Sequence, residues 1–300
     1  MGLMDAVLGE PPLEFHPVRW MGSFLSLAER WNGNRALKGW KGRTAGAGWV
    51  LAGTLLATWV GSTLGRRTGQ RNGVLSSLLS AAVVKPSFAL RGLRTAGARV
   101  RRALEAGDLA GARRHLGRDL VSRPTEDLSA TEGAGAAIES LAENLSDSVV
   151  APLMYTVAGG SGAAYAYRFA NTADAMLGYR TPALADFGWC AARLDDVLNA
   201  APARLTAAVV ALLAPTVGGY ANEALAVALT DGRATPSPNA GWPMGAMAGG
   251  LGVRLTKRGA YTLNRGGRDP ASDDLKRAEV LISRAGALSV VVAAALAEAR

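Results

Sequence analysis

Six carboxylates between residues 139 and 196 are candidates for catalysis or metal binding. Long uncharged stretches separate them and follow them in the sequence. No charged residue occurs from Ser148 to Tyr167 or from Leu205 to Asn222. Carboxylates gathered beside apolar chain repel one another unless a cation, a Mg²⁺–phosphate complex or arginine side chains neutralise them. The sequence therefore predicts a polar site between apolar segments, formed by Glu139, Glu143, Asp147, Asp174, Asp195 and Asp196.

Helical periodicity places three of these carboxylates on one face. Residues 129–132, SATE, have the pattern of a capping box and predict the start of a helix. On that helix Glu139, Glu143 and Asp147 recur at i, i+4 and i+8 and share one stripe, with Asn144 beside it. A solvated acidic surface is the alternative interpretation of the same stripe.

Two further predicted helices, over residues 167–180 and 187–205, carry polar faces of the same kind. The residues that share these faces are Arg168, Asn171 and Asp174 on the first helix and Asp195, Asp196 and Asn199 on the second. Pro202 is expected to mark the end of the second helix. The alternative is that its acidic residues form ion pairs at the helix end with Arg193 and Arg204.

Apolar segments of membrane length must position these faces. Residues 44–65 form an uncharged run of 22 residues with basic residues on both sides, long enough to span a bilayer. Residues 74–84, 148–167, 205–222 and 285–297 are shorter or interrupted by proline and glycine. Broken segments are tolerated where neighbouring protein satisfies the backbone. We therefore expect an all-α, polytopic integral membrane protein with broken or re-entrant helices around a polar site, forming one membrane-embedded domain over residues 1–300.

The positive charge of the chain is concentrated in one segment. The net charge is +9 with a pI near 10.2, which would permit nucleic-acid binding. Yet nine Lys or Arg residues and only two acids lie between Lys85 and Arg118, the bias typical of a cytoplasmic loop. We expect a basic amphipathic cytoplasmic segment at about residues 85–124 and no nucleic-acid partner. One cysteine and two histidines exclude an intramolecular disulfide and argue against a zinc cluster.

Residues 236–255 contain three prolines and five glycines, which predict a break in helical structure. Their backbone N–H groups could approach an anion, and close packing of small residues is the alternative. Residues 256–268 are predicted to be a loop. Phosphate-binding motifs such as GxxxxGK[ST] or GxGxxG after a strand are absent from the sequence.

Five blocks of the sequence, in this order, resemble the CobD/CbiB family of cobalamin biosynthesis. They are LGEPP…HPVRWMG (8–22), AAIESLAENLSDSVVAPL (136–153), YRFANTADAMLGYR (167–180), FGWCAARLDDVLNAAPARLTA (187–207) and SPNAGWPMGAMAGGLGVRL (237–255). Glu10 stands where the family usually has aspartate, and Pro124 stands where it has an acid. The resemblance covers most of the chain.

The resemblance implies an enzyme of the bacterial inner membrane with several spans. Family members join adenosylcobyric acid to (R)-1-amino-2-propanol, or to its O-phosphate, through an amide bond, and the phosphate route implies ATP and Mg²⁺. Membrane lipid and other late cobalamin-synthesis enzymes are the remaining expected partners. A non-catalytic corrinoid-binding membrane scaffold is the alternative function.

Roles for individual residues follow from matching positions and side-chain chemistry. The six carboxylates named above are candidates for catalysis, and Glu143, Asp147, Asp195 and Asp196 are the candidates for Mg²⁺. Arginines could hold phosphate groups and asparagines could orient substrate amides. The substrate-binding candidates are Asn144, Asn171, Arg180, Arg193, Asn199, Arg204, Asn239 and Arg254.

Overall fold

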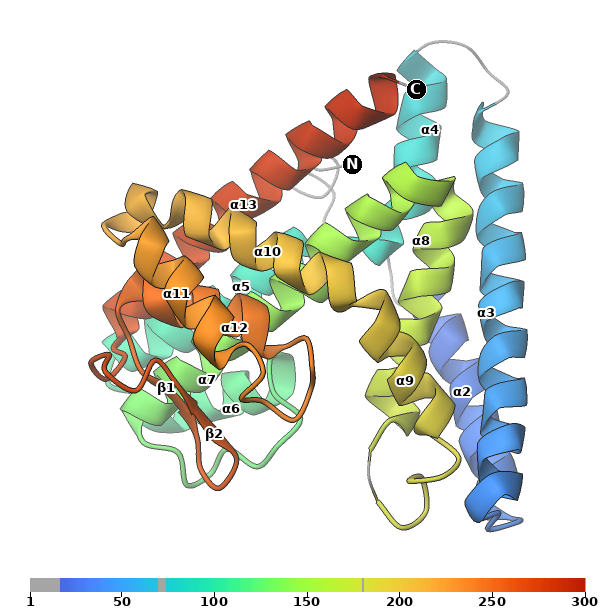
Figure 1. Cartoon of the computed structure of the whole chain (residues 1–300), viewed down its shortest axis with the longest axis horizontal. Helices are drawn as coiled ribbons and strands as arrows, with labels where there is room; N and C mark the ends of the chain where they lie inside the picture. The colour runs from blue at the N-terminus through green and yellow to red at the C-terminus, as the bar shows by residue number, and fades with distance from the viewer. Residues whose placement is uncertain (1–16, 70–73, 180, 300) are drawn as a thin grey trace. The chain divides into compact units, whose positions relative to one another are not determined.

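The computed structural model describes residues 17–69, 74–179 and 181–299, and helices dominate it (Figure 1). These residues divide into two compact units. The first contains the described residues before Leu90, together with Ala151–Asn199 and the residues from Ala293 onward. The second contains Leu90–Val150 and Ala200–Val292. The prediction of a single membrane-embedded domain is not tested by this division and stays a prediction.

The first unit is a bundle of helices around an aromatic core. Its helices are α2 (Pro17–Gly33), α3 (Gly39–Gly69), α4 (Val74–Val84), α8 (Ala151–Leu177) and α9 (Trp189–Leu198), with a 3₁₀ turn at Lys85–Ser87. Phe24 packs edge-on against Trp49 and Phe169, with ring centroids 5.2 and 5.8 Å apart. The α8 helix is kinked at Gly159 and Gly160, as the predicted break in residues 148–167 required.

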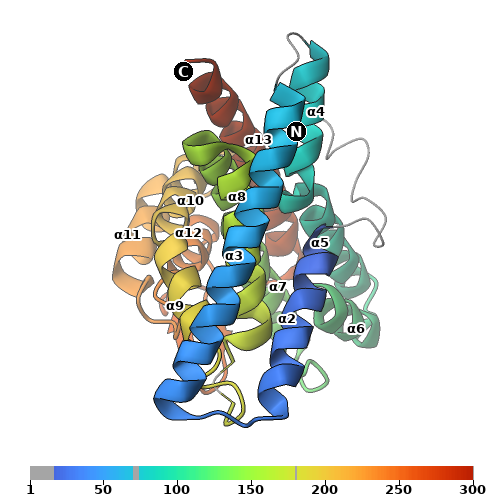
Figure 2. The ribbon, with the colours of Figure 1, turned by 90° about the vertical axis from the view of Figure 1, so that its right-hand side faces the viewer.

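Glycines of α3 let α8 approach it closely, and the two helices lie side by side (Figure 1, Figure 2). A Cβ atom on Gly53 would lie 2.0 Å from the Phe169 ring, and one on Gly61 would lie 2.6 Å from the Ser161 carbonyl oxygen. The Ser161 hydroxyl donates a hydrogen bond of 2.8 Å to the Gly61 carbonyl. Small residues and interhelical hydrogen bonds are the usual basis of helix packing in membranes.

The substitution Gly46→Ala is expected to destabilise this unit by about 1–3 kcal/mol, because the new Cβ would lie 1.8 Å from the carbonyl oxygen of Phe187. The backbone at Phe187 cannot move away from the new atom as easily as a flexible side chain could. Gly48→Ala is the matched control on the same helix, since nothing lies within 4 Å of its new Cβ. Thermal unfolding in detergent should show a lower Tm for the first variant only, and equal Tm values would contradict the close approach.

The second unit contains most of the remaining helices. They are α5 (Leu90–Glu105), α6 (Leu109–Asp119), α7 (Ala130–Leu145), α10 (Ala200–Leu213), α11 (Ala221–Asp231), α12 (Gly241–Leu251) and the part of α13 (Ser272–Glu298) that precedes Ala293. A π-helical turn, Ser146–Val150, follows α7, and a 3₁₀ turn, Ala214–Val217, follows α10. The short strands β1 (Leu255–Lys257) and β2 (Tyr261–Leu263) pair as an antiparallel hairpin.

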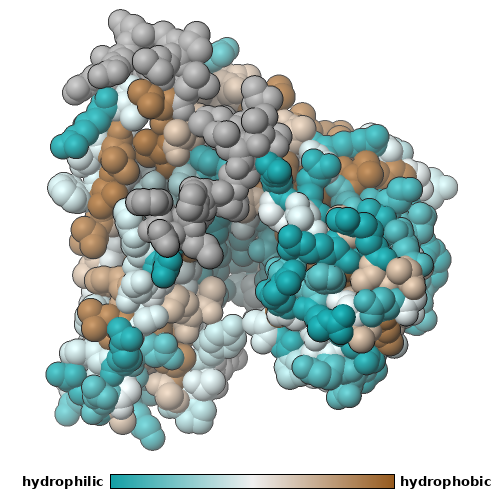
Figure 3. Space-filling view, turned by 180° about the vertical axis from the view of Figure 1, so that it is seen from behind, coloured by the Kyte–Doolittle hydropathy of each residue, from teal (hydrophilic) through white to brown (hydrophobic). Residues whose placement is uncertain are grey.

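Among the described residues, three helices are long and apolar enough to cross a membrane, and they confirm the prediction of an all-α membrane protein. They are Gly39–Thr68, Ala200–Val217 and Ser272–Glu298. Large apolar side chains on α3 are exposed, among them Leu55 at 69% and Trp59 at 63%, as lipid contact requires. Figure 3 shows many apolar residues on the surface of the first unit, whereas the surface of the second unit drawn there is mostly hydrophilic.

Three local predictions for the second unit are wrong. Residues 241–251 form a helix despite the glycines, because Gly245 and Gly249 pack against the α11 backbone and Pro243 lies in the first turn. Residues 256–268 contain the β1–β2 hairpin rather than only a loop. Pro202 does not end a helix but lies in the first turn of α10, where its missing N–H costs nothing.

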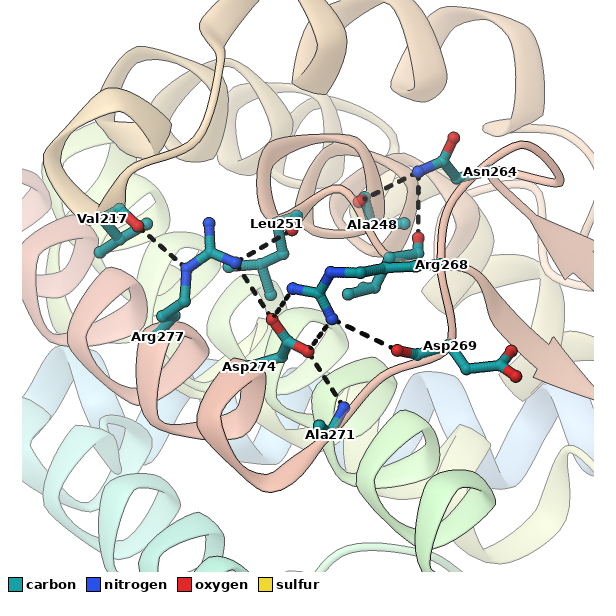
Figure 4. Close-up of polar contacts among 10 residues, drawn as sticks. Val217, Ala248, Leu251, Asn264, Arg268, Asp269, Ala271, Asp274 and Arg277 are labelled. Atoms are coloured by element: carbon teal, nitrogen blue, oxygen red, sulfur yellow. Dashed lines mark hydrogen bonds and ion pairs between the residues drawn. The ribbon is translucent and has the colours of Figure 1, made fainter.

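A buried ionic network holds the start of α13 (Figure 4). The carboxylate of Asp274, 1% exposed, accepts hydrogen bonds from the guanidinium groups of Arg268 and Arg277 and from the Ala271 N–H. Arg277 also donates to the carbonyl oxygens of Val217 at 2.9 Å and Leu251 at 3.1 Å. Asp274 therefore pairs with two arginines and also accepts the N–H group at the start of its own helix.

Arginines of α13 also donate hydrogen bonds to backbone carbonyl oxygens at the end of α10. The 3₁₀ turn there ends at Gly218, which has a left-handed φ of 75°, so its last carbonyl oxygens point out of the helix. Arg284 donates a hydrogen bond to Thr216 O, and Arg277 donates one to Val217 O. The end of this broken segment is thus satisfied by side chains from another helix, as membrane-embedded backbone requires.

Candidate functional site

The α7 helix begins as predicted. The Ser129 hydroxyl accepts a hydrogen bond from the Glu132 N–H, and the Glu132 carboxylate accepts one from the Ser129 N–H, which makes the capping box complete. Arg258 from the β1–β2 turn also pairs with Glu132. Residues 133–142 of α7 are all buried, so this helix lies in the core of its unit.

Glu139 is the most unusual carboxylate of this buried helix, because only 6% of it is exposed. Its Oε2 atom lies 3.7 Å from Arg123 Nη2, whereas its Oε1 atom is buried without a hydrogen-bond partner among the described residues. Burial raises the pKa of Glu139 to about 7, although the charge of Arg123 and the nearby Tyr261 and Lys257 favour the ionised form. A carboxyl group of this kind can exchange a proton near neutral pH.

Glu139, Glu143 and Asp147 do not form the continuous acidic stripe that the sequence predicted. Glu139 is buried, Glu143 is exposed and Asp147 is half-buried. The α-helix ends at Leu145, and the π-helical turn that follows changes the angle between successive residues. The prediction that Asp147 continues an i, i+4, i+8 stripe is therefore wrong, because that spacing holds only for an unbroken α-helix. Asn144 donates hydrogen bonds to the Ser140 carbonyl and hydroxyl oxygens.

Asp195 is the centre of a second polar cluster, which lies in the first unit. Its Oδ1 atom accepts hydrogen bonds from the side-chain amides of Asn171 at 3.2 Å and Asn199 at 3.0 Å. Of the predicted polar face of Asp195, Asp196 and Asn199, the proximity of Asp195 and Asn199 is thus confirmed, with Asn199 directly after the end of α9. Burial raises the pKa of Asp195, and the charge of Asp196 adds to the increase, whereas the two asparagine amides oppose it.

Aromatic and basic side chains surround this Asp195 cluster and fix its asparagines. The Tyr167 hydroxyl donates to Asn199 Oδ1 at 2.8 Å, and the Tyr167 ring stacks on Tyr155 with centroids 5.1 Å apart. Arg168 donates to Asn171 Oδ1 at 3.4 Å and to the carbonyl of Ser87. Each asparagine amide therefore has a donor side directed at Asp195 and an acceptor side held by another residue.

If this cluster takes part in catalysis, the substitution Asp195→Asn is expected to slow the catalysed reaction by about 10²-fold while leaving the Tm of the protein nearly unchanged. An asparagine Oδ1 can accept the same two hydrogen bonds but carries no negative charge for a metal ion or a proton. Glu29→Gln, on the exposed surface of α2, is the charge-matched control. Initial rates and thermal unfolding should be measured for both variants. A large decrease in the Tm of Asp195→Asn would mean that Asp195 stabilises the fold and that the loss of rate is a consequence of misfolding.

The other predicted residues are distributed over both units. In the second unit, Arg204 donates to Asn239 Oδ1 at 3.0 Å and packs on the Trp242 ring. Arg254, in the same unit, pairs with Asp269 at 2.6 Å, and both line a cavity of about 720 Å³ at the start of α7. The remaining candidates belong to the first unit: Asp174 is half-buried on α8, Arg193 pairs with Asp196 at 3.0 Å, and Arg180 lies outside the described residues. The alternative of an ion pair on α9 is thus confirmed for Arg193.

Several residues of these clusters were not predicted from the sequence. Arg123 and Tyr261 reach Glu139 from a loop and a hairpin, and Tyr155 and Tyr167 belong to an apolar run that was interpreted only as a broken span. Helical periodicity contains no signal for partners from other elements. The substitution of an acid by Pro124, next to Arg123, was the one feature that singled out this loop.

The acidic residues were compared with the ligand sets that bind metal ions in proteins. Within the described part of the chain, no three or more His, Cys, Asp or Glu side chains converge as ligands. Mg²⁺ in nucleotide sites is commonly held by one or two carboxylates, with phosphate oxygens and waters completing its shell. Asp195 and Asp196 offer two carboxylates in the first unit, and Glu143 and Asp147 belong to the other unit. The assignment of Mg²⁺ to these four residues stays a prediction.

Comparison with known proteins identifies the relatives of this chain. Residues 2–289 match the family described as CobD/CbiB protein. The chain is 38% identical to the "Probable cobalamin biosynthesis protein CobD" of Methanothrix thermoacetophila, over 98% of this chain and 94% of that protein. It is 39% identical to the "Cobalamin biosynthesis protein CobD" of Dehalococcoides mccartyi (97% and 93% covered) and 37% identical to that of Rhodobacter capsulatus (94% and 90% covered). No solved structure matches the chain.

Proposed function

Because the chain belongs to the CobD/CbiB family and acts in cobalamin biosynthesis, we propose that it is an ATP-dependent amide ligase. It joins a carboxylate of adenosylcobyric acid to the amine of (R)-1-amino-2-propanol or of its O-phosphate, and the product is adenosylcobinamide or adenosylcobinamide phosphate. The enzyme works in the bacterial inner membrane. Its three candidate spans support a membrane location.

The buried Glu139 carboxylate is the observation that carries this proposal. The amine must lose a proton before its nitrogen can attack an acyl carbon, because an ammonium group has no free electron pair. Glu139 has one buried oxygen without a hydrogen-bond partner in the described part of the chain, and burial raises its pKa to about 7, so it can take that proton at physiological pH. The nitrogen then forms the amide bond and the activated oxygen leaves as phosphate.

ATP supplies the phosphoryl group that activates the carboxylate of the corrinoid. Arginine and asparagine side chains of the chain bind and orient the substrates. Arg204, held by Asn239 and Trp242, is a preorganised guanidinium of the second unit. In the first unit Asp195 and Asp196 would hold Mg²⁺. The cluster of Asn171, Asn199 and Tyr167 positions Asp195 for that role.

The test uses detergent-purified protein with adenosylcobyric acid, Mg²⁺ and either aminopropanol or aminopropanol phosphate, with and without ATP. Mass spectrometry should detect the amide product only when ATP is present, and the two amine donors compared in parallel identify the substrate. Corrinoid binding without product, for every amine and nucleotide tried, would reject the ligase. The chain would then be a corrinoid-binding scaffold.

A further inference from the structure

A cavity of about 590 Å³ in the second unit has four arginines among its ten lining residues. It lies between α6 and the loop after it. We call it the α6 arginine pocket, and its arginines are Arg113, Arg114, Arg118 and Arg123. The Ser122 and Thr125 side chains also line it, and Glu126 is the one acid among the lining residues. The lining therefore carries a clear excess of positive charge.

Protein carboxylates neutralise this charge only in part. Arg118 forms two hydrogen bonds with Asp119, at 2.7 and 2.9 Å, and is the best paired of the four. Arg113 donates to a neutral acceptor, the Leu128 carbonyl, at 2.8 Å. The side chain of Arg114 is 72% exposed, and its nearest carboxylate, that of Asp108, is 3.9 Å away. At least two guanidinium groups thus lack a close carboxylate partner.

The fourth arginine links the pocket to the candidate base. Arg123 lines the cavity and lies 3.7 Å from the buried Glu139, which is too far for a strong charge-assisted hydrogen bond. Its guanidinium group therefore has donors left for another acceptor. A ligand in the pocket would be bound directly beside the residue that takes the proton of the amine.

We propose that the α6 arginine pocket binds the phosphate chain of a soluble polyphosphate, which in the ligation reaction is that of ATP. This inference rests on the proposed function for the identity of the nucleotide. Guanidinium groups recognise phosphate through paired, charge-assisted hydrogen bonds. A triphosphate, with about four negative charges, matches a lining of four arginines and one acid better than a monophosphate does. The hydroxyl groups of Ser122 and Thr125 lie in the same lining.

The test measures binding of tripolyphosphate and of orthophosphate by calorimetry, with full-length protein in phosphatidylcholine nanodiscs. The double substitution Arg114→Gln with Arg118→Gln should weaken tripolyphosphate binding by about 100-fold, or tenfold for each arginine removed. Arg94→Gln with Arg102→Gln is the matched control, because both residues are exposed on α5 outside the pocket and the charge change is the same. The control variant should bind within about twofold of the wild type.

Three results would overturn the proposal. An equal loss of tripolyphosphate affinity in both double variants would mean that binding depends only on the net charge of the segment. Equal affinity for orthophosphate and tripolyphosphate would reject a polyphosphate site. Loss of tripolyphosphate binding when phosphatidylglycerol is added to the nanodiscs would assign the arginines to lipid headgroups.

The ligation assay keeps this proposal separate from the proposed function. Unchanged ATP-dependent amide formation in the pocket variant would reject the pocket alone. Tripolyphosphate binding that needs Arg114 and Arg118, together with no amide product under any condition, would reject the ligase alone.

Discussion

Replacing Glu139 with glutamine is expected to lower kcat for amide formation by about 10²- to 10⁴-fold, the usual contribution of a general base. Glutamine has nearly the same size but cannot take a proton from the amine. The wild-type rate should rise with pH through about 7, the pKa to which burial raises Glu139, because only the ionised carboxylate is a base. The variant should lack this dependence. Rates measured by mass spectrometry between pH 5.5 and about 8.5 test both expectations.

The same variant should unfold less readily than the wild type at alkaline pH. Burial raises the pKa of Glu139 from 4.5 to about 7, so the folded state holds its proton more tightly than the unfolded chain does. Stability from this group is complete below pH 4.5 and is lost as the pH rises to about 7. Since each tenfold change in proton affinity is worth about 1.4 kcal/mol, Glu139→Gln should gain about 3 kcal/mol above pH 7.

Glu29→Gln serves again as the control, because Glu29 is exposed on α2. It should change neither the rate nor the pH dependence of unfolding. If Glu139→Gln lost activity but was equally destabilised at every pH, its carboxylate would be a packing group, and the assignment of Glu139 as the base would fail.

Asp274→Ala is expected to have the largest effect on folding, a loss of about 3–5 kcal/mol. The substitution removes a carboxylate that is 1% exposed and leaves Arg268 and Arg277 without their shared counter-charge (Figure 4). It also removes the acceptor for the Ala271 N–H at the start of α13. Thermal unfolding in detergent should show a large decrease in Tm.

Asp273→Ala is the matched control for this prediction. Asp273 occupies the neighbouring position in the first turn of α13 but is exposed. An exposed carboxylate near a helix start contributes about 0.3–1 kcal/mol, so this variant should remain close to the wild type. Similar decreases in both variants would show that helix electrostatics, and not the buried network, is responsible.

Sequence patterns predicted the structure correctly where it depends on residues that are close together along the chain. The capping box of Ser129 and Glu132 was predicted at its observed position, because a helix cap is a local feature. The kink in α8 was likewise predicted from its two adjacent glycines. The proximity of Asp195 and Asn199 follows from their shared polar face, because i, i+4 neighbours lie on one side of a helix.

Patterns failed where contacts come from distant parts of the chain. The side chains that contact Glu139 come from residues 123 and 261, and no periodicity relates these positions. The π-helical turn after Leu145 interrupted a stripe that was calculated for an ideal α-helix. Residues 241–251 form a helix because their small side chains allow close packing, a tertiary gain that outweighs the low helix propensity of glycine.

The arginines that complete the end of α10 have a consequence for the synthesis of this protein. The carbonyl acceptors at Thr216 and Val217 precede their donors, Arg284 and Arg277, by 68 and 60 residues. A ribosome-bound chain that ends before Arg277 therefore holds an apolar segment whose final carbonyls have no protein donor. The hydrogen bonds at the end of α10 can therefore form only after α13 has been synthesised, so we expect the packing of these two helices to be a late step of folding.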